Sequence, residues 1–168
     1  TQFASSAASD VYKRQLYALR AIYLHEMDRF RRTLTQSVLS PVLTTSLYFI
    51  VFGSVIGGYV EKIDGISYGS YIVPGLLMLT LLTQSISNTS FGIFFPKFNG
   101  TIYEILAAPI STLEVVLAFV GAGATKTLIV SIIIFITSLF FVDVQVKYPL
   151  LMIFLLILVA FTFALFGF

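Results

Sequence analysis

Long apolar stretches separated by short polar ones form the pattern of this chain. The mostly apolar stretches cover residues 37–57, 71–95, 115–142 and 148–168. A helix needs about 20 such residues to cross a hydrocarbon core of about 30 Å, because lipid offers its backbone no hydrogen-bond partners. The stretches do not alternate in polarity, which argues against a transmembrane β-barrel. The pattern therefore predicts an all-α polytopic membrane protein with four transmembrane helices.

Composition supports this interpretation, since 58% of the residues are hydrophobic and only 11% are charged. Too few polar side chains remain to cover the surface of a soluble domain of this length, so apolar surface is expected to face lipid. The chain has no cysteine, which excludes disulfides and thiolate metal sites.

Residues 1–15 are rich in serine and alanine, lack an apolar signal core, and resemble an assembly scar. We expect them to be a non-native or disordered leader, followed by one transmembrane domain over residues 16–168. The chain begins with Thr1 and ends inside an apolar run, so we expect it to be a fragment.

Residues 16–32, before the first apolar stretch, show the three- and four-residue spacing of an amphipathic helix. Its apolar positions are Leu16, Leu19, Tyr23, Met27 and Phe30, and its basic residues cluster at the end as Arg29, Arg31 and Arg32. Such a helix can lie in the membrane interface, with its arginines near anionic head groups. The alternative interpretation is that these three arginines only determine the orientation of the chain in the membrane.

The positive charges also predict the orientation. Six of the ten lysines and arginines precede Gln36 and one more lies in the loop 96–112, whereas the loops on the other side hold only Lys62 and Lys147. Because positive residues accumulate on the cytoplasmic side, seven against two places the N-terminus and the loop 96–112 in the cytoplasm.

The second stretch carries polar residues on one helical face. Its candidate pathway or subunit-interface residues are Thr80, Gln84, Ser87 and Asn88. This face should avoid lipid. It either lines a substrate path or subunit interface, or supplies hydrogen bonds between helices at about 0.6 kcal/mol each.

Lys126 interrupts the third stretch and would cost about 2.5–3.5 kcal/mol at a helix centre. The 16 residues from 127 to 142 are nearly enough to span a membrane, so we expect Lys126 to be a cation at the cytoplasmic boundary. A buried substrate-binding lysine is the alternative. The small residues in GAGATKT, 121–127, favour close helix packing, because their spacing does not match a phosphate loop.

No catalytic constellation is present. The chain lacks the phosphate-loop, H-E-x-x-H and G-x-S-x-G motifs, and its single histidine, His25, has no partner for a metal site. We expect no enzymatic activity, no bound metal or cofactor, and no nucleic-acid partner. All eight acidic residues lie outside the uncharged interiors of the stretches, which argues against an ion-coupled carrier.

Three segments carry a family resemblance: MDRFRRTLTQSVLSPVLTTSLYFIVFGSVIGG, SYGSYIVPGLLML and FPKFNGTIYEILAAPISTLEVVLAFVGAGATKT. Over residues 17–168 the chain resembles the permease subunit of an ABC-2 type transporter. The most specific element is GTIYEILAAPIS, which is similar to the family's pattern of Gly, then Glu-Leu-Leu, then Ala-Pro.

The resemblance implies an exporter in a bacterial inner membrane, built as a permease dimer on two cytoplasmic ATPase subunits that use ATP and Mg²⁺. It implies six spans, of which this chain would lack the last two. It also implies that residues 99–109 contain the coupling helix that docks on the ATPase. The residues expected to couple are Gly100, Thr101, Ile102, Tyr103, Glu104, Ile105, Leu106 and Pro109.

The residues of this loop agree with a short helix. Gly100 permits a sharp turn, Thr101 and Glu104 have the spacing of a capping box, and Pro109 stops the helix. Ser111 or Thr112 can cap the next helix, with Glu114 in its first turn. Alternatives to a transport subunit are a membrane scaffold without a transport path and a fragment of an ion-coupled carrier.

Overall fold

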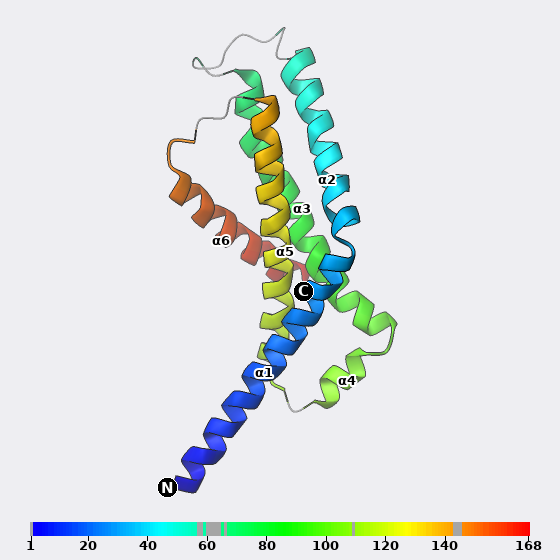
Figure 1. Ribbon diagram of the computed structural model, residues 1–168, viewed down its shortest axis with the longest axis vertical. Coiled ribbons are helices and arrows are strands. Elements are labelled where there is room, and N and C mark those ends of the chain that lie inside the picture. Colours follow the sequence, from blue (N-terminus) through cyan, green and yellow to red (C-terminus); the bar gives the residue numbers. More distant parts are fainter. Residues whose placement is uncertain (1, 57–58, 60–64, 66, 109, 143–145) are drawn as a thin grey trace.

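Helices make up every regular element of this protein in the part that its structure, a computed structural model, describes (Figure 1). The structure describes residues 2–56, 59, 65, 67–108, 110–142 and 146–168. In chain order the elements are α1 (Gln2–Arg32), α2 (Leu34–Tyr48), the π-helical segment η1 (Phe49–Ile56), α3 (Tyr68–Phe98), α4 (Ile102–Ala107), α5 (Thr112–Phe141) and α6 (Pro149–Gly167). The all-α prediction is confirmed.

Four helices are long and apolar enough to cross a membrane. They cover Leu34–Phe52, Tyr68–Phe98, Thr112–Phe141 and Pro149–Gly167. Three of these helices begin earlier than the apolar runs, because polar residues extend them. Ser67, for example, accepts a hydrogen bond from the Ser70 N–H at 3.3 Å and so caps α3 before its apolar residues start.

The centre of the molecule is α5, which contacts α1, α2, α3 and α6. Figure 1 shows α2 and α3 beside its upper part, α6 inclined to it, and α1 crossing its lower part. One core cluster joins Phe30 of α1 and Phe49 of η1 to Leu77 of α3 and Ile134 of α5. These four helical segments bury their apolar faces together, which fixes how α1 meets the membrane-crossing helices.

A second core cluster holds α6 in place. It joins Leu81 of α3, Val120 and Ala124 of α5, and the four-residue series Leu156, Ala160 and Ala164 of α6. Residues four apart lie on the same face of a helix, so this series forms one stripe. Small residues in the stripe allow the backbones of neighbouring helices to approach closely.

Helix α1 begins at Gln2, earlier than Leu16, where the apolar spacing starts. That residues 1–15 are a non-native leader stays a prediction. The apolar stripe of α1 packs partly on protein and is not reserved for lipid: Phe30 is buried and Met27 packs against the same core cluster, whereas Leu16 is exposed. That residues 16–32 lie in the membrane interface stays a prediction.

Two of the helices are longer than a membrane crossing requires. Helix α3 has 31 residues and α5 has 30, which corresponds to about 45 Å each at about 1.5 Å per residue. The end of α6 contacts α3 near Ile86 and Ser90. The ends of these two helices that α4 joins, residues 91–98 of α3 and 112–122 of α5, are called the stalk. It carries α4 at its end (Figure 1).

Candidate functional site

The loop between α3 and α5 contains a short helix, α4, as the sequence predicts. Helix α3 ends at Phe98, and Gly100 has a φ of +77°, a left-handed conformation that glycine adopts without a steric penalty. After α4, Ser111 forms the N-cap of α5, and its N–H donates a hydrogen bond to Glu114 Oε2 at 3.0 Å. The turn at Gly100 and the cap at Ser111 are thus confirmed.

The cap that the sequence predicts at Thr101 is wrong. Thr101 precedes α4 with φ −63° and ψ −19°, and its side chain makes no capping hydrogen bond. A capping hydroxyl needs an extended backbone to reach the N–H groups ahead of it, and Thr101 is already helical. The stop predicted at Pro109 lies outside the described residues.

Helix α4 exposes part of its apolar surface. Tyr103 is 73% exposed and Leu106 is 69% exposed, whereas Ile102 and Ile105 are half-buried. Glu104 is exposed beside them. Among the described helices, α4 contacts chiefly α3, and no residue of α4 is buried. The structure therefore leaves Tyr103, Glu104 and Leu106 available to a partner.

A buried ion pair joins α1 to α5. Lys126 Nζ lies 2.7 Å from Glu26 Oε2, and the two residues are 3% and 2% exposed. Arg29 on α1 lies 2.8 Å from the same carboxylate oxygen. Sequence reasoning missed this cluster, because Glu26 sits in a charged segment that looks solvated and its partner is 100 residues away.

Several residues pack closely around the ion cluster of Glu26, Arg29 and Lys126. A Cβ added to Gly92 would lie 3.7 Å from Glu26 Oε2 and 3.4 Å from a Phe119 ring carbon, which are ordinary contacts, so Gly92 lies directly beside the carboxylate. The Arg29 guanidinium lies 5.7 Å from the centre of the Phe95 ring. One helical turn before Glu26, the Tyr23 hydroxyl donates to Thr125 Oγ1 at 3.1 Å.

Lys126 therefore has an environment that neither sequence interpretation described. A lysine at the membrane boundary would extend its ammonium to water, and a substrate-binding lysine would have no ion-pair partner within the protein. The Lys126 ammonium is instead enclosed by protein and paired with Glu26. Glu26 is the one buried carboxylate among the described residues. Because Glu26 pairs with both Lys126 and Arg29, it is not an unpaired carboxylate of the kind that ion-coupled carriers use.

The polar face predicted on α3 is only half enclosed. Thr80, Gln84 and Asn88 are half-buried, and Ser87 is exposed. The Thr80 hydroxyl donates to Leu76 O of its own helix at 2.8 Å, and Asn88 Nδ2 donates to Thr127 Oγ1 of α5 at 3.2 Å. Of the four candidate residues, Asn88 is thus the one seen bonding another helix.

The fully buried polar face of α3 lies one position away, at Ser85 and Thr89. Ser85 Oγ donates to Ala160 O of α6 at 2.6 Å, and Thr89 packs against Gly123 of α5. This confirms that the small residues around Gly123 serve close helix packing. The usable signal was the four-residue series Val73, Leu77, Leu81, Ser85, Thr89, which is buried along its whole length.

Comparison with known proteins agrees with this architecture. The sequence pattern of the family described as ABC-2 type transporter matches residues 17–168. The chain belongs to this family. It is 39% identical over 150 residues to the inner membrane transport permease YadH of Escherichia coli K12 and to that of Shigella flexneri. The match covers 89% of this chain and 59% of each relative, so the chain spans about three fifths of their length. No solved structure matches.

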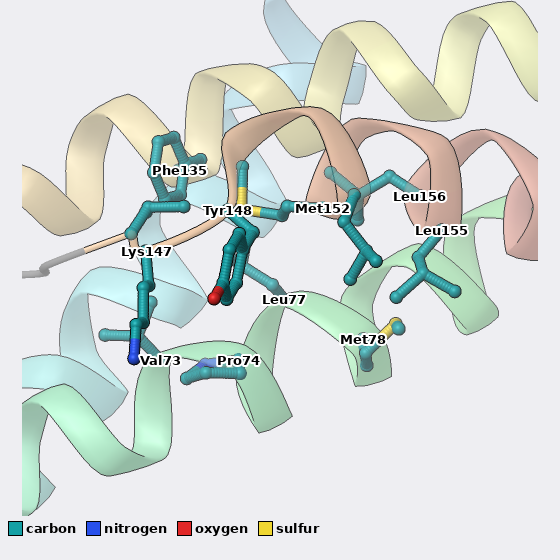
Figure 2. A pocket seen from close by; sticks show the side chains of 12 residues that line it. Val73, Pro74, Leu77, Met78, Phe135, Lys147, Tyr148, Met152, Leu155 and Leu156 are labelled. Atoms are coloured by element: carbon teal, nitrogen blue, oxygen red, sulfur yellow. The ribbon is translucent and has the colours of Figure 1, made fainter.

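This ABC-2 membrane domain also has an apolar cavity at the other end of the bundle. The cavity has a volume of about 390 Å³ and lies between α3, the start of α6 and the chain that leads to it (Figure 2). Val73, Leu77 and Phe135 form its inner wall, and Lys147 and Tyr148 lie at its edge. Its mostly apolar lining is suited to an acyl chain or an apolar side chain.

A metal centre is not formed by the residues of this ABC-2 domain that the structure describes. No three His, Asp or Glu side chains in the described ranges come together as metal ligands. His25 lies on α1 near Asp28 and lines a different, polar cavity with Arg29 and Arg32.

Proposed function

We propose that this chain is part of the permease subunit of an ABC exporter in a bacterial inner membrane. The observation that carries the proposal is the exposed apolar face of α4, set on the stalk between two membrane-crossing helices. Membership of the ABC-2 type transporter family and the relatives named as inner membrane transport permeases support it. The chain would supply the membrane path, and a separate ATPase would bind and hydrolyse ATP with Mg²⁺.

In this proposal α4 is the coupling helix. Tyr103 and Leu106 would enter an apolar groove of the ATPase, as amphipathic helices do in many complexes, and Glu104 would pair with a basic residue at its rim. A short helix anchored only at its two ends can move when its partner moves. It would pass that movement to α3 and α5, to which it is directly connected.

The ion pair of Glu26 and Lys126 would transmit this movement to another helix, α1. Because Glu26 and Lys126 join α1 to the middle of α5, a shift of α5 would also carry α1. The pair is thus a positioning contact in the proposed mechanism. Access to the membrane path would change when these helices move together between two arrangements.

The permease would work as a homodimer. Thr83 and Ser87 are exposed polar residues on α3, a membrane-crossing helix, and Gln84 beside them is half-buried. Polar groups facing lipid are unfavourable, which supports contact of this strip with a second subunit or with a polar path.

Copurification with the ATPase tests the coupling proposal. In the permease expressed together with its ATPase, Tyr103→Ala and Glu104→Arg should reduce the amount of ATPase retained and the transport-coupled hydrolysis of ATP. Tyr148→Ala is a matched control, since Tyr148 is 65% exposed but lies at the other end of the bundle. If the Tyr103 and Glu104 variants behave like the Tyr148 variant, α4 is not the coupling helix.

Cysteine labelling tests the orientation. These 168 residues contain no cysteine, so in a permease whose remaining residues are also free of cysteine each introduced thiol reports one position. A cysteine at Lys147 should react with a membrane-impermeant reagent added to whole cells, and a cysteine at Lys97 should react only after the cells are broken. The reverse result would invert the proposed topology.

A further inference from the structure

A polar cavity lies where the end of α1 meets the end of α3 and the turn into α4. Its volume is about 380 Å³, within the range of roughly 300–1,000 Å³ that is common for small-ligand sites. Its walls include Asp28, Arg29 and Arg32 from α1, Phe95 from α3, and Asn99 and Thr101 from the turn. This cavity is distinct from the exposed face of α4.

Some charged side chains in this cavity have an ion-pair partner and others do not. Arg29 is fixed in place, because its guanidinium pairs with Glu26 and lies over Phe95. Asp28 and Arg32 have no ion pair with any described residue, although both line the same cavity and are four residues apart on one helix. Opposite charges at this spacing often pair with each other. Here the cavity presents an unpaired carboxylate and an unpaired guanidinium.

The position of the cavity relates it to the membrane surface. Arg32 is the last residue of α1, and the first candidate span begins two residues later, at Leu34. Basic residues next to a span lie at the level of lipid head groups. Arginine is suited to bind a phosphate through two parallel hydrogen bonds, and Arg29 beside Arg32 supplies further donors.

We propose that this cavity binds the head group of a phospholipid that joins a phosphate to a primary ammonium, as in phosphatidylethanolamine. The phosphate lies between Arg29 and Arg32, and the ammonium donates to the Asp28 carboxylate. Asn99 and Thr101 offer neutral hydrogen-bond groups to the same ligand. The carboxylate favours a head group with an ammonium that can donate to it, because a head group without one leaves the carboxylate unpaired.

Lipid binding to the purified permease in detergent tests this proposal by native mass spectrometry. Phosphatidylethanolamine should bind about ten-fold more tightly than phosphatidylglycerol, which lacks the ammonium, or phosphatidylcholine, whose ammonium has no N–H to donate. Asp28→Asn should remove this preference. Arg32→Gln should weaken the binding of all three lipids about ten-fold, since each has the phosphate.

Arg31 provides the matched control. It is adjacent to Arg32 and equally charged, but it does not line the cavity. Arg31→Gln should leave the preference for phosphatidylethanolamine unchanged. Equal effects of Arg31→Gln and Arg32→Gln would show general attraction to a charged surface and would overturn the proposal, as would equal binding of the three lipids by the unaltered protein.

The ATPase is a different class of partner for this cavity, and the same variants separate the two. If Asp28→Asn and Arg32→Gln reduce ATPase copurification and leave the lipid preference unchanged, the cavity binds protein and the proposal is wrong. Lipid selectivity lost in Asp28→Asn, with ATPase retention intact, supports it. This result does not depend on whether α4 is the coupling helix.

Discussion

The contact between α1 and α5 and the contact between α3 and α6 hold one molecule together by different means. Buried charges, Glu26 and Lys126, join α1 to α5. Small residues and hydroxyl groups join α3 to α6, through Ser85 on Ala160 O and Ser90 on Gly167 O. The first contact depends on both of its partners being present, whereas the second is spread over several weak interactions.

This difference matters because the two kinds of contact respond differently to loss. A buried ion left without its partner is strongly destabilising, while a well-packed apolar replacement of the whole pair is often neutral. A hydrogen bond between helices in a membrane contributes much less. The α1–α5 contact should therefore be sensitive to single changes and tolerant of matched double changes, and the α3–α6 contact should show neither behaviour.

The largest effect is expected from Glu26→Ala, which leaves Lys126 buried and unpaired. Thermal unfolding in detergent should show a loss of about 3–5 kcal/mol. Adding Lys126→Met to a Glu26→Leu protein should recover most of the stability, because no charge then remains buried. Asp28→Asn is the control on the same helix, since Asp28 is exposed. A double variant no more stable than Glu26→Ala would contradict the role given to the pair.

An intermediate effect is expected from Gly123→Ala on α5. The added Cβ would collide with Thr89 Oγ1 and lie 3.3 Å from Thr89 Cβ, so the Thr89 side chain or the spacing of the two helices must change, at about 1–3 kcal/mol. Gly121→Ala is the matched control, because nothing lies within 4 Å of its added Cβ. It should stabilise the helix by up to about 1 kcal/mol. Equal unfolding midpoints for the two variants would argue against close packing at Gly123.

The smallest effect is expected from Ser85→Ala, which removes the bond to Ala160 O. Its cost should be about 0.6 kcal/mol, the average for hydrogen bonds between membrane helices. Thr89→Val on the same face should cost nothing or stabilise, because the buried Thr89 hydroxyl has no hydrogen-bond partner among the described residues. Denaturant unfolding of both variants measures the difference between their free energies of unfolding. A larger loss of stability in Thr89→Val than in Ser85→Ala would contradict this ranking of the two hydroxyl groups.

The sequence predicted the features of this molecule that depend on neighbours in the chain. The apolar runs located the four membrane-crossing helices, and Gly100 located the turn before α4. Both follow from local rules, since a helix in lipid needs a continuous apolar run and a left-handed turn favours glycine. The cap at Thr101 failed because several residues in a loop have capping side chains and the backbone decides which one is used.

The features that depend on distant parts of the chain were not predicted. Glu26 and Lys126 are 100 residues apart, and neither position shows which side of its helix faces the other. On α3, hydroxyl and amide groups occur on two adjacent faces, so polarity alone could not show that Ser85 and Thr89, rather than Thr80 and Gln84, would be enclosed. Only the packing of α5 and α6 decides between these faces.

The stalk has a geometric consequence. Each of its two helices is continuous with a membrane-crossing segment, and in the proposed coupling each would act as a lever whose tip carries α4. When such a lever tilts, the displacement of its tip grows in proportion to the length beyond the pivot. The ion pair of Glu26 and Lys126 joins α1 to the middle of α5, near the point where the stalk begins, so in the proposed mechanism α1 would move together with this lever.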